Sequence, residues 1–152
     1  NAAFDLTEPA VREKFGVPRD SRYAVLGMGK LGGREISYHS DLDLMVVYEA
    51  DGDTGPPPGA GKRFATTSNI HHFTELTQRA IKCLSQTGPL GRLYAVDMRL
   101  RPTGKSGSLV VPLCEFRRYF APGGAAQLWE RQALTRARVV RSPSGSPQRG
   151  DR

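Results

Sequence analysis

The chain has 152 residues, of which 38% are hydrophobic and 24% charged, proportions typical of one globular domain with or without a tail. Its net charge of +7 suits an anionic ligand such as a nucleotide, and nucleic acid is the second choice because no block of lysine and arginine carries interleaved aromatic residues. No apolar run of about 18 residues predicts a membrane span, and the two distant cysteines, Cys83 and Cys114, indicate reduced thiols of a cytoplasmic protein.

The first predicted element is a short helix over residues 5–15, with Thr7 as its N-cap. The apolar run 23–26 has the composition of a strand, and a glycine-rich turn follows it. Backbone N–H groups around this turn, near the start of a short helix, can cradle phosphate. The candidate phosphate-binding residues are Gly29, Lys30, Gly32 and Gly33.

Two carboxylates open the next predicted strand, which runs from Asp41 through Tyr48. Alternate residues of a strand share a face, so Asp41 and Asp43 point the same way. Neighbouring carboxylates at a buried strand repel each other and lose hydration, a conflict that Mg²⁺ or Mn²⁺ resolves when phosphates complete its octahedron. The alternative is an Asp-x-Asp turn or cap with both carboxylates in water. The glycine turn just upstream favours metal-dependent nucleotidyl transfer.

Residues 50–61 are rich in glycine and proline and predict a surface loop without regular structure. Apolar residues recurring at spacings of three and four predict a helix over 67–86, with Thr67 or Ser68 as N-cap. His71 and His72 lie on this helix at a spacing unsuited to a zinc pair, and we expect them at the surface or partly packed.

The stretch 92–101 returns to strand character. A period of two directs Val96, Met98 and Leu100 to the core and places three charged residues on the opposite face: Asp97, Arg99 and Arg101. This face would supply a third carboxylate and two guanidinium groups to a metal–triphosphate site. The alternative is an exposed face on which the acid and the two bases only pair with each other.

Residues 104–107 read Gly-Lys-Ser-Gly but lack the first glycine of a P-loop, so we expect a tight turn from which Lys105 reaches phosphate. A strand over 108–111 and helices over 112–120 and 126–139 complete the predicted elements. Leu128, Ala133 and Leu134 would face inward on the last helix, and Arg131, Arg136 and Arg138 would form its basic side. The Ser/Pro/Gly-rich composition of 141–152 predicts a disordered tail.

Four motifs together resemble the glutamine synthetase adenylyltransferase/adenylyl-removing family of polymerase-β-like nucleotidyltransferases. They span roughly residues 20–140 in the family's order: Gly-Met-Gly-Lys-Leu-Gly-Gly from Gly27, Ser40-Asp41-Leu42-Asp43-Leu44, Val96 to Pro102 with the Gly104–Gly107 turn, and Trp129 to Arg138. The last motif favours the transferase half over the adenylyl-removing half. Because the chain begins with Asn and would hold one catalytic domain where the family has two, we expect a fragment of a longer protein, with the catalytic domain in residues 1–140.

The resemblance implies an α+β fold with a small mixed sheet flanked by helices. It implies that Asp41, Asp43 and Asp97 are catalytic and hold two Mg²⁺ ions, and that ATP is the substrate. The acceptor would be a tyrosine of glutamine synthetase, with phosphorolysis as the removing reaction and PII signal protein as a partner of the full-length family. The implied nucleotide-binding residues are Gly29, Lys30, Gly32, Gly33, Ser40, Arg99, Arg101 and Lys105.

Two alternatives come from other functional classes. A catalytically silent ATP-sensing module would lack at least one carboxylate, whereas all three are present here. A nucleic-acid nucleotidyltransferase would carry an appended basic RNA-binding region, for which the stretch after residue 140 is too short and too poor in aromatic residues.

Overall fold

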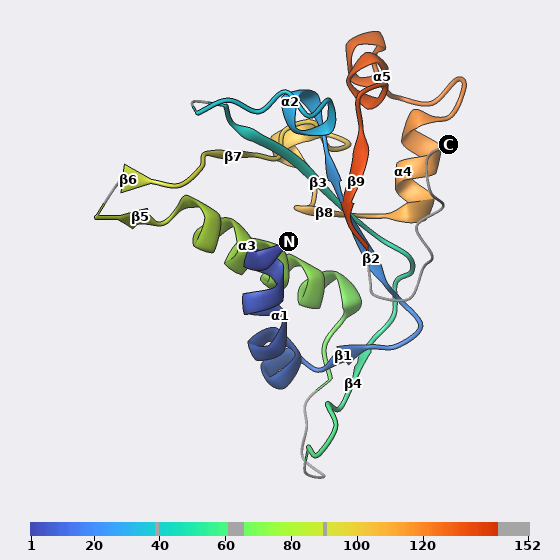
Figure 1. The fold of residues 1–152 in the computed structure, drawn as a ribbon. Coiled ribbons are helices and arrows are strands. Elements are labelled where there is room, and N and C mark those ends of the chain that lie inside the picture. Colours follow the sequence, from blue (N-terminus) through green and yellow to red (C-terminus); the bar gives the residue numbers. More distant parts are fainter. Residues whose placement is uncertain (39, 61–65, 90, 143–152) are drawn as a thin grey trace, which may run out of the picture.

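A small mixed sheet forms the centre of the computed structural model, which describes residues 1–38, 40–60, 66–89 and 91–142 (Figure 1). Its helices are α1 (Ala2–Phe15), α2 (Gly29–Gly32), α3 (Asn69–Ser85), α4 (Leu113–Phe120) and α5 (Leu128–Leu134), with one 3₁₀ turn at Gly104–Ser106. Its strands are β1 (Val17–Pro18), β2 (Tyr23–Gly27), β3 (Leu42–Tyr48), β4 (Thr54–Gly55), β5 (Thr87–Gly88), β6 (Gly91–Arg92), β7 (Val96–Asp97), β8 (Val110–Pro112) and β9 (Arg138–Arg141). The predicted α+β class with a small mixed sheet, as expected for a polymerase-β-like nucleotidyltransferase, is confirmed.

Strand β3 is the centre of the sheet. The strand order is β7-β3-β2-β9, and β8 also pairs with β3. β2 runs antiparallel to β3 and to β9, whereas β7 and β8 run parallel to β3 and meet its beginning and its end. A parallel strand needs a long crossover connection, and the chain between β3 and β7 contains α3.

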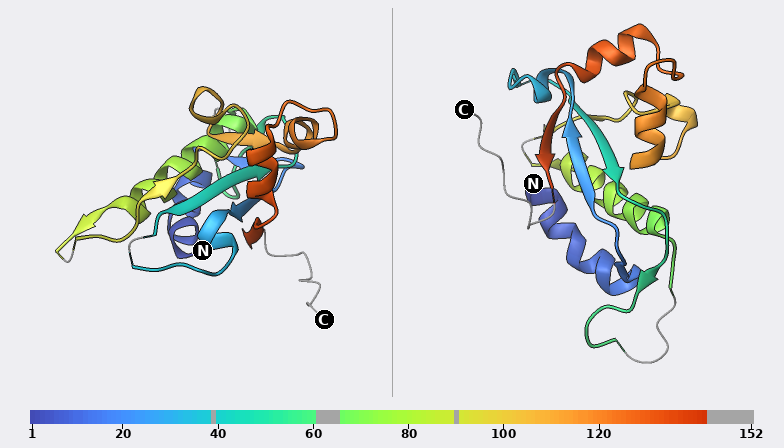
Figure 2. Two further views of the ribbon diagram at one scale, coloured as in Figure 1. Left: turned by 90° about the horizontal axis from the view of Figure 1, so that it is seen from above. Right: turned by 90° about the vertical axis from the view of Figure 1, so that its right-hand side faces the viewer.

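Two apolar clusters cover the two faces of β3. Leu44, Val46 and Tyr48 belong to the larger cluster, which α1 and α3 complete with Phe4, Val11, Phe73 and Leu76. Met45 and Val47 belong to the smaller cluster, beneath α4 and α5. Figure 2 shows α1 and α3 on one side of the sheet and α4 on the other. By alternation Asp43 lies in phase with Met45 and Val47, on the side of α4 and α5.

Two expectations for the first half of the chain are wrong. Helix α1 begins at Ala2, so Thr7 is not its N-cap, and the Thr7 hydroxyl instead donates to the Ala3 carbonyl at 2.8 Å. The predicted irregular loop 50–61 contains β4, which pairs with β1, and Thr54 is buried there. Residue 61 of that loop lies outside the described residues. Helix α3 has the predicted N-cap, because the Ser68 side chain accepts a hydrogen bond from the His71 amide.

Two expectations for the second half are also wrong. The predicted strand 92–101 is divided into β6 and the two-residue β7, and residues 99–101 form a turn. The predicted helix 126–139 ends at Leu134, and its last residues form β9, which pairs with β2. Arg141, the first residue of the predicted tail, ends β9, and residues 143–152 lie outside the described residues. Over the part of the chain that the structure describes, no helix is long and apolar enough to cross a membrane.

Candidate active site

Asp43 and Asp97 lie opposite each other on neighbouring strands. The parallel register of β3 and β7 pairs Asp43 with Asp97 and Leu42 with Val96. Asp41, just before β3, is exposed, and Asp43 is half-buried. Burial raises the pKa of Asp43, and the negative charges of Asp97 and Asp41 raise it further. The fold therefore pairs Asp43 with Asp97 across two strands and leaves Asp41 near enough for its charge to act on Asp43.

The glycine turn is in direct contact with this cluster. The Met28 amide donates to the Asp43 carbonyl at 2.8 Å, which places Gly29 beside the Asp43 side chain. Gly29 has a φ of +49°, and a Cβ atom there would lie 2.4 Å from Asp43 Oδ2. Glycine is required at this position both for its backbone conformation and for the approach of the carboxylate.

Three cationic side chains act on the carboxylates, one of them by direct contact. The Arg99 amide donates to Asp97 Oδ1 at 2.8 Å, and its Nε donates to Oδ2 at 2.7 Å. These hydrogen bonds lower the pKa of Asp97, and the positive charge of Lys105 lowers it further. Lys30 acts in the same direction on the pKa of Asp43. Lys30 and Lys105 are exposed, so their ammonium groups are available to an anionic ligand, whereas the exposed Arg99 guanidinium is already paired with Asp97.

Arg101 and Ser40 have local hydrogen-bond partners in this structure. The Arg101 side chain is only 8% exposed and donates to the backbone carbonyls of Met98, Gly107 and Ser108, so it closes the turn between β7 and β8. The predicted common face of Asp97, Arg99 and Arg101 is not formed, because β7 ends at Asp97. The buried Ser40 hydroxyl accepts from the Ser37 amide at 3.1 Å and holds the bend before Asp41.

The chemistry of the three carboxylates matches a hard divalent cation such as Mg²⁺, which prefers carboxylate oxygens. A bound cation would also offset the burial and the neighbouring negative charges that raise the pKa of Asp43. Among the described residues no three Asp, Glu, His or Cys side chains converge closely enough to form a ready-made metal centre, and Asp97 is hydrogen-bonded to Arg99.

The Trp129–Arg138 motif stabilises the surrounding structure. Glu130 is buried, and its Oε1 accepts a hydrogen bond from the Tyr119 hydroxyl at 2.9 Å. Glu130 also completes a capping box with Gln127. The Arg131 guanidinium donates to four backbone carbonyls of the α4–α5 connection: Phe120, Ala121, Gly124 and Ala126. Leu128, Ala133 and Leu134 were expected to face inward on the last helix. This prediction is wrong for Leu128, which is 73% exposed, and confirmed for Ala133 and Leu134, which pack on the smaller cluster.

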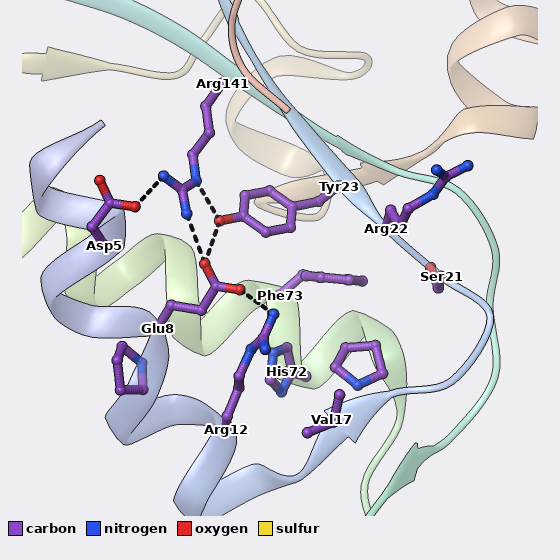
Figure 3. A pocket seen from close by; sticks show the side chains of 12 residues that line it. Asp5, Glu8, Arg12, Val17, Ser21, Arg22, Tyr23, His72, Phe73 and Arg141 are labelled. Atoms are coloured by element: carbon purple, nitrogen blue, oxygen red, sulfur yellow. Dashed lines mark hydrogen bonds and ion pairs between the residues drawn. The ribbon is translucent and has the colours of Figure 1, made fainter. Parts of the chain in front are cut away.

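A cavity of about 690 Å³ lies elsewhere, between α1, the β1–β2 connection and α3. Its charged side chains are mutually paired: Arg141 donates to Asp5, Glu8 and the Tyr23 hydroxyl (Figure 3). Among the lining residues, His72 is fully buried rather than at the surface or partly packed, and burial lowers its pKa to about 4. Since these charges are already paired, the cavity offers an anion less than the exposed Lys30 and Lys105 beside the carboxylates do.

Comparison with known proteins places the chain among enzymes of one kind. Residues 1–151 match the family model described as glutamate-ammonia ligase adenylyltransferase. Proteins named bifunctional glutamine synthetase adenylyltransferase/adenylyl-removing enzyme are 42% identical over 85% of the chain in Xanthobacter autotrophicus, 46% over 81% in Nitrosococcus oceani and 40% over 95% in Rhodopseudomonas palustris. The matches cover only 12%, 12% and 14% of those relatives' lengths.

Proposed function

The chain belongs to the glutamate-ammonia ligase adenylyltransferase family, and on that premise we propose that it carries a site transferring AMP between ATP and a protein hydroxyl. The observation that carries this proposal is the pairing of Asp43 with Asp97, with Gly29 packed against the Asp43 carboxylate. Asp41, Asp43 and Asp97 are the proposed catalytic residues. The order of these residues in the chain is that of the family motifs.

The proposed reaction is an in-line displacement. The oxygen of the acceptor tyrosine of glutamine synthetase forms a bond to the α-phosphorus of ATP, and the bond to pyrophosphate breaks. In the removing direction, a phosphate oxygen forms a bond to the phosphorus of the tyrosine-bound AMP, the bond to the tyrosine oxygen breaks, and ADP and the free tyrosine are the products. Neither direction needs a serine, cysteine or histidine nucleophile, so no covalent enzyme intermediate forms. Regulation of nitrogen assimilation in the cytoplasm, with PII signal protein as a partner of the longer protein, belongs to the same proposal.

Asp41, Asp43 and Asp97 would hold two Mg²⁺ ions, which neutralise phosphate charge and acidify the attacking hydroxyl when bound. Arg99 keeps Asp97 ionised by lowering its pKa, which favours a ligand role for Asp97 over the role of proton acceptor. The exposed Lys30, Arg99 and Lys105 would contact the triphosphate, with the Gly29–Gly33 turn. Arg101 and Ser40 contribute by shaping the turns that present these groups.

A two-arm incubation tests the proposal. One arm offers the chain Mg²⁺, ATP and unmodified glutamine synthetase, and AMP on the tyrosine with released pyrophosphate is expected. The other offers adenylylated glutamine synthetase with phosphate, and measures ADP. Product in the first arm supports the transferase half, and product in the second alone assigns the removing half. If ATP binds and neither arm gives product, the proposed transfer by this chain is wrong, and the chain is an ATP-sensing module or an inactive fragment.

The Asp43→Asn variant is the matched control for both arms. It removes one charge from the repelling cluster without changing the size of the side chain, so the fold should persist and transfer should disappear. Normal transfer by this variant would contradict the assignment of Asp43.

A further inference from the structure

Strand β9 and the residues before it contact the back of the glycine turn, a role that nucleotide transfer does not itself explain. Arg138 pairs in register with Gly27, the last residue of β2. Its side chain reaches α2, where Nη2 donates to the Leu31 carbonyl at 3.2 Å and Nε to the Gly32 carbonyl at 3.3 Å. A segment more than a hundred residues away in the chain thus contacts the end of α2.

Both carbonyls lie at the end of α2, and the Leu31 carbonyl also accepts a hydrogen bond from the Arg34 amide at 3.3 Å. The last carbonyls of any helix lack intrahelical partners, and α2 consists of a single turn. A guanidinium group offers several N–H donors in a rigid plane, so it can bond two neighbouring carbonyls at once. An ammonium group carries its donors on one atom and does not match that geometry.

The beginning of α2 is bonded to β3, the strand that carries Asp43. The Met28 amide donates to the Asp43 carbonyl at 2.8 Å, and the Gly32 amide donates back to the Met28 carbonyl at 2.8 Å. Helix α2 is therefore held between Asp43 at its beginning and Arg138 at its end. The fit is tight at the Arg138 side as well, because a Cβ atom on Gly32 would lie 1.9 Å from the Arg136 carbonyl oxygen.

We propose that Arg138 is a positioning residue that holds α2 so that Gly29 stays against the Asp43 carboxylate. The proposal rests on the proposed nucleotide transfer only for its kinetic readout, because the hydrogen bonds themselves are independent of the reaction. Arg136 has a different part: its guanidinium pairs with Glu35 at 2.8 Å, and both side chains are about half exposed, at 54% and 53%. A pair of this kind contributes little.

The test compares Arg138→Gln with the matched control Arg136→Gln in the 152-residue chain. The first readout is amide hydrogen exchange at Gly32 and Gly33, whose N–H groups bond inside α2. Arg138→Gln should accelerate exchange at these amides by about 10-fold, the size expected for losing hydrogen bonds from a charged group. Arg136→Gln should leave exchange within about 2-fold of the parent chain.

The second readout is AMP transfer, for which Arg138→Gln should lower kcat/KM by about 10-fold and Arg136→Gln should not. Arg138→Lys keeps the positive charge but loses the planar set of guanidinium donors, so in both readouts it should lie between Arg138→Gln and Arg136→Gln. Arg138→Lys also provides the comparison if Arg138→Gln does not fold. Equal exchange in Arg138→Gln and Arg136→Gln overturns the proposal. If the parent chain transfers no AMP, the proposed function fails, while the exchange comparison still decides the role of Arg138.

Discussion

Replacing Gly29 by alanine tests the candidate active site most directly. The backbone there has a φ of +49°, and an added methyl group would lie 2.4 Å from an oxygen of Asp43. The left-handed backbone alone costs an L-residue about 1–2 kcal/mol of folding free energy. The overlap is a separate effect, because the methyl group and the carboxylate must move apart by about 1 Å, and a misplacement of that size costs on the order of 10²-fold in rate.

Gly123→Ala is the matched control for the backbone effect. Gly123 also has a positive φ, +75°, but no heavy atom lies within 4 Å of the position of its added Cβ. Urea unfolding should show that both variants lose about 1–2 kcal/mol. The rate of AMP transfer should fall on the order of 10²-fold in Gly29→Ala and stay near that of the parent in Gly123→Ala.

The comparison separates a damaged fold from a damaged site. If both variants lose activity in proportion to their loss of stability, the contact between Gly29 and Asp43 has no catalytic meaning. Parent-like transfer by Gly29→Ala would refute the reasoning outright, since the Asp43 carboxylate would then be free to move without consequence.

Three further variants test other parts of the structure. Asp97→Asn should keep MgATP affinity in calorimetry and lose transfer by on the order of 10³-fold; retained turnover at neutral pH would make Asp97 only a partner of Arg99. Burial lowers the pKa of His72 from 6.5 to about 4, so between these two pH values the unfolded chain binds more protons than the folded chain. The free energy of unfolding should therefore decrease by up to about 3 kcal/mol as the pH falls from about 6.5 to about 4. His72→Leu should flatten that decrease in urea titrations at several pH values, and an unchanged slope would exclude His72 as its source. Arg101→Gln should lower the unfolding free energy by about 2–3 kcal/mol in urea, because the guanidinium bonds three carbonyls, and an unchanged midpoint would contradict this.

The strand that begins beside Asp41 and carries Asp43 was predictable from sequence because its pattern is local. Asp41 and Asp43 alternate with leucines and lead into an uninterrupted apolar run, as expected for a strand that is buried on both faces. The short helix after the first strand was predictable from its glycines for the same reason. The contact of Gly29 with Asp43 was not, since it depends on how the turn folds back onto β3.

Strand β9 and the Arg101 turn depended on tertiary contacts. Residues 135–139 fit the end of a helix by composition, but the free edge of β2 pairs with β9 and this pairing prevails over local propensity. Arg101 alternates correctly with Asp97 and Arg99 in the sequence. Three carbonyls of the following turn nevertheless bind its guanidinium and bury it.

The register of β7 decides which side chain meets Asp43. A shift of one residue would exchange the two faces of the strand and direct Met98 toward the carboxylates. Met98 is buried in the larger apolar cluster, to which α3 also contributes, and this burial fixes the phase of a strand only two residues long. The Leu42 amide, which donates to the Ala95 carbonyl at 2.8 Å, adds a backbone bond in the same register. The position of Asp97, a proposed catalytic carboxylate, therefore follows from the packing of the methionine beside it.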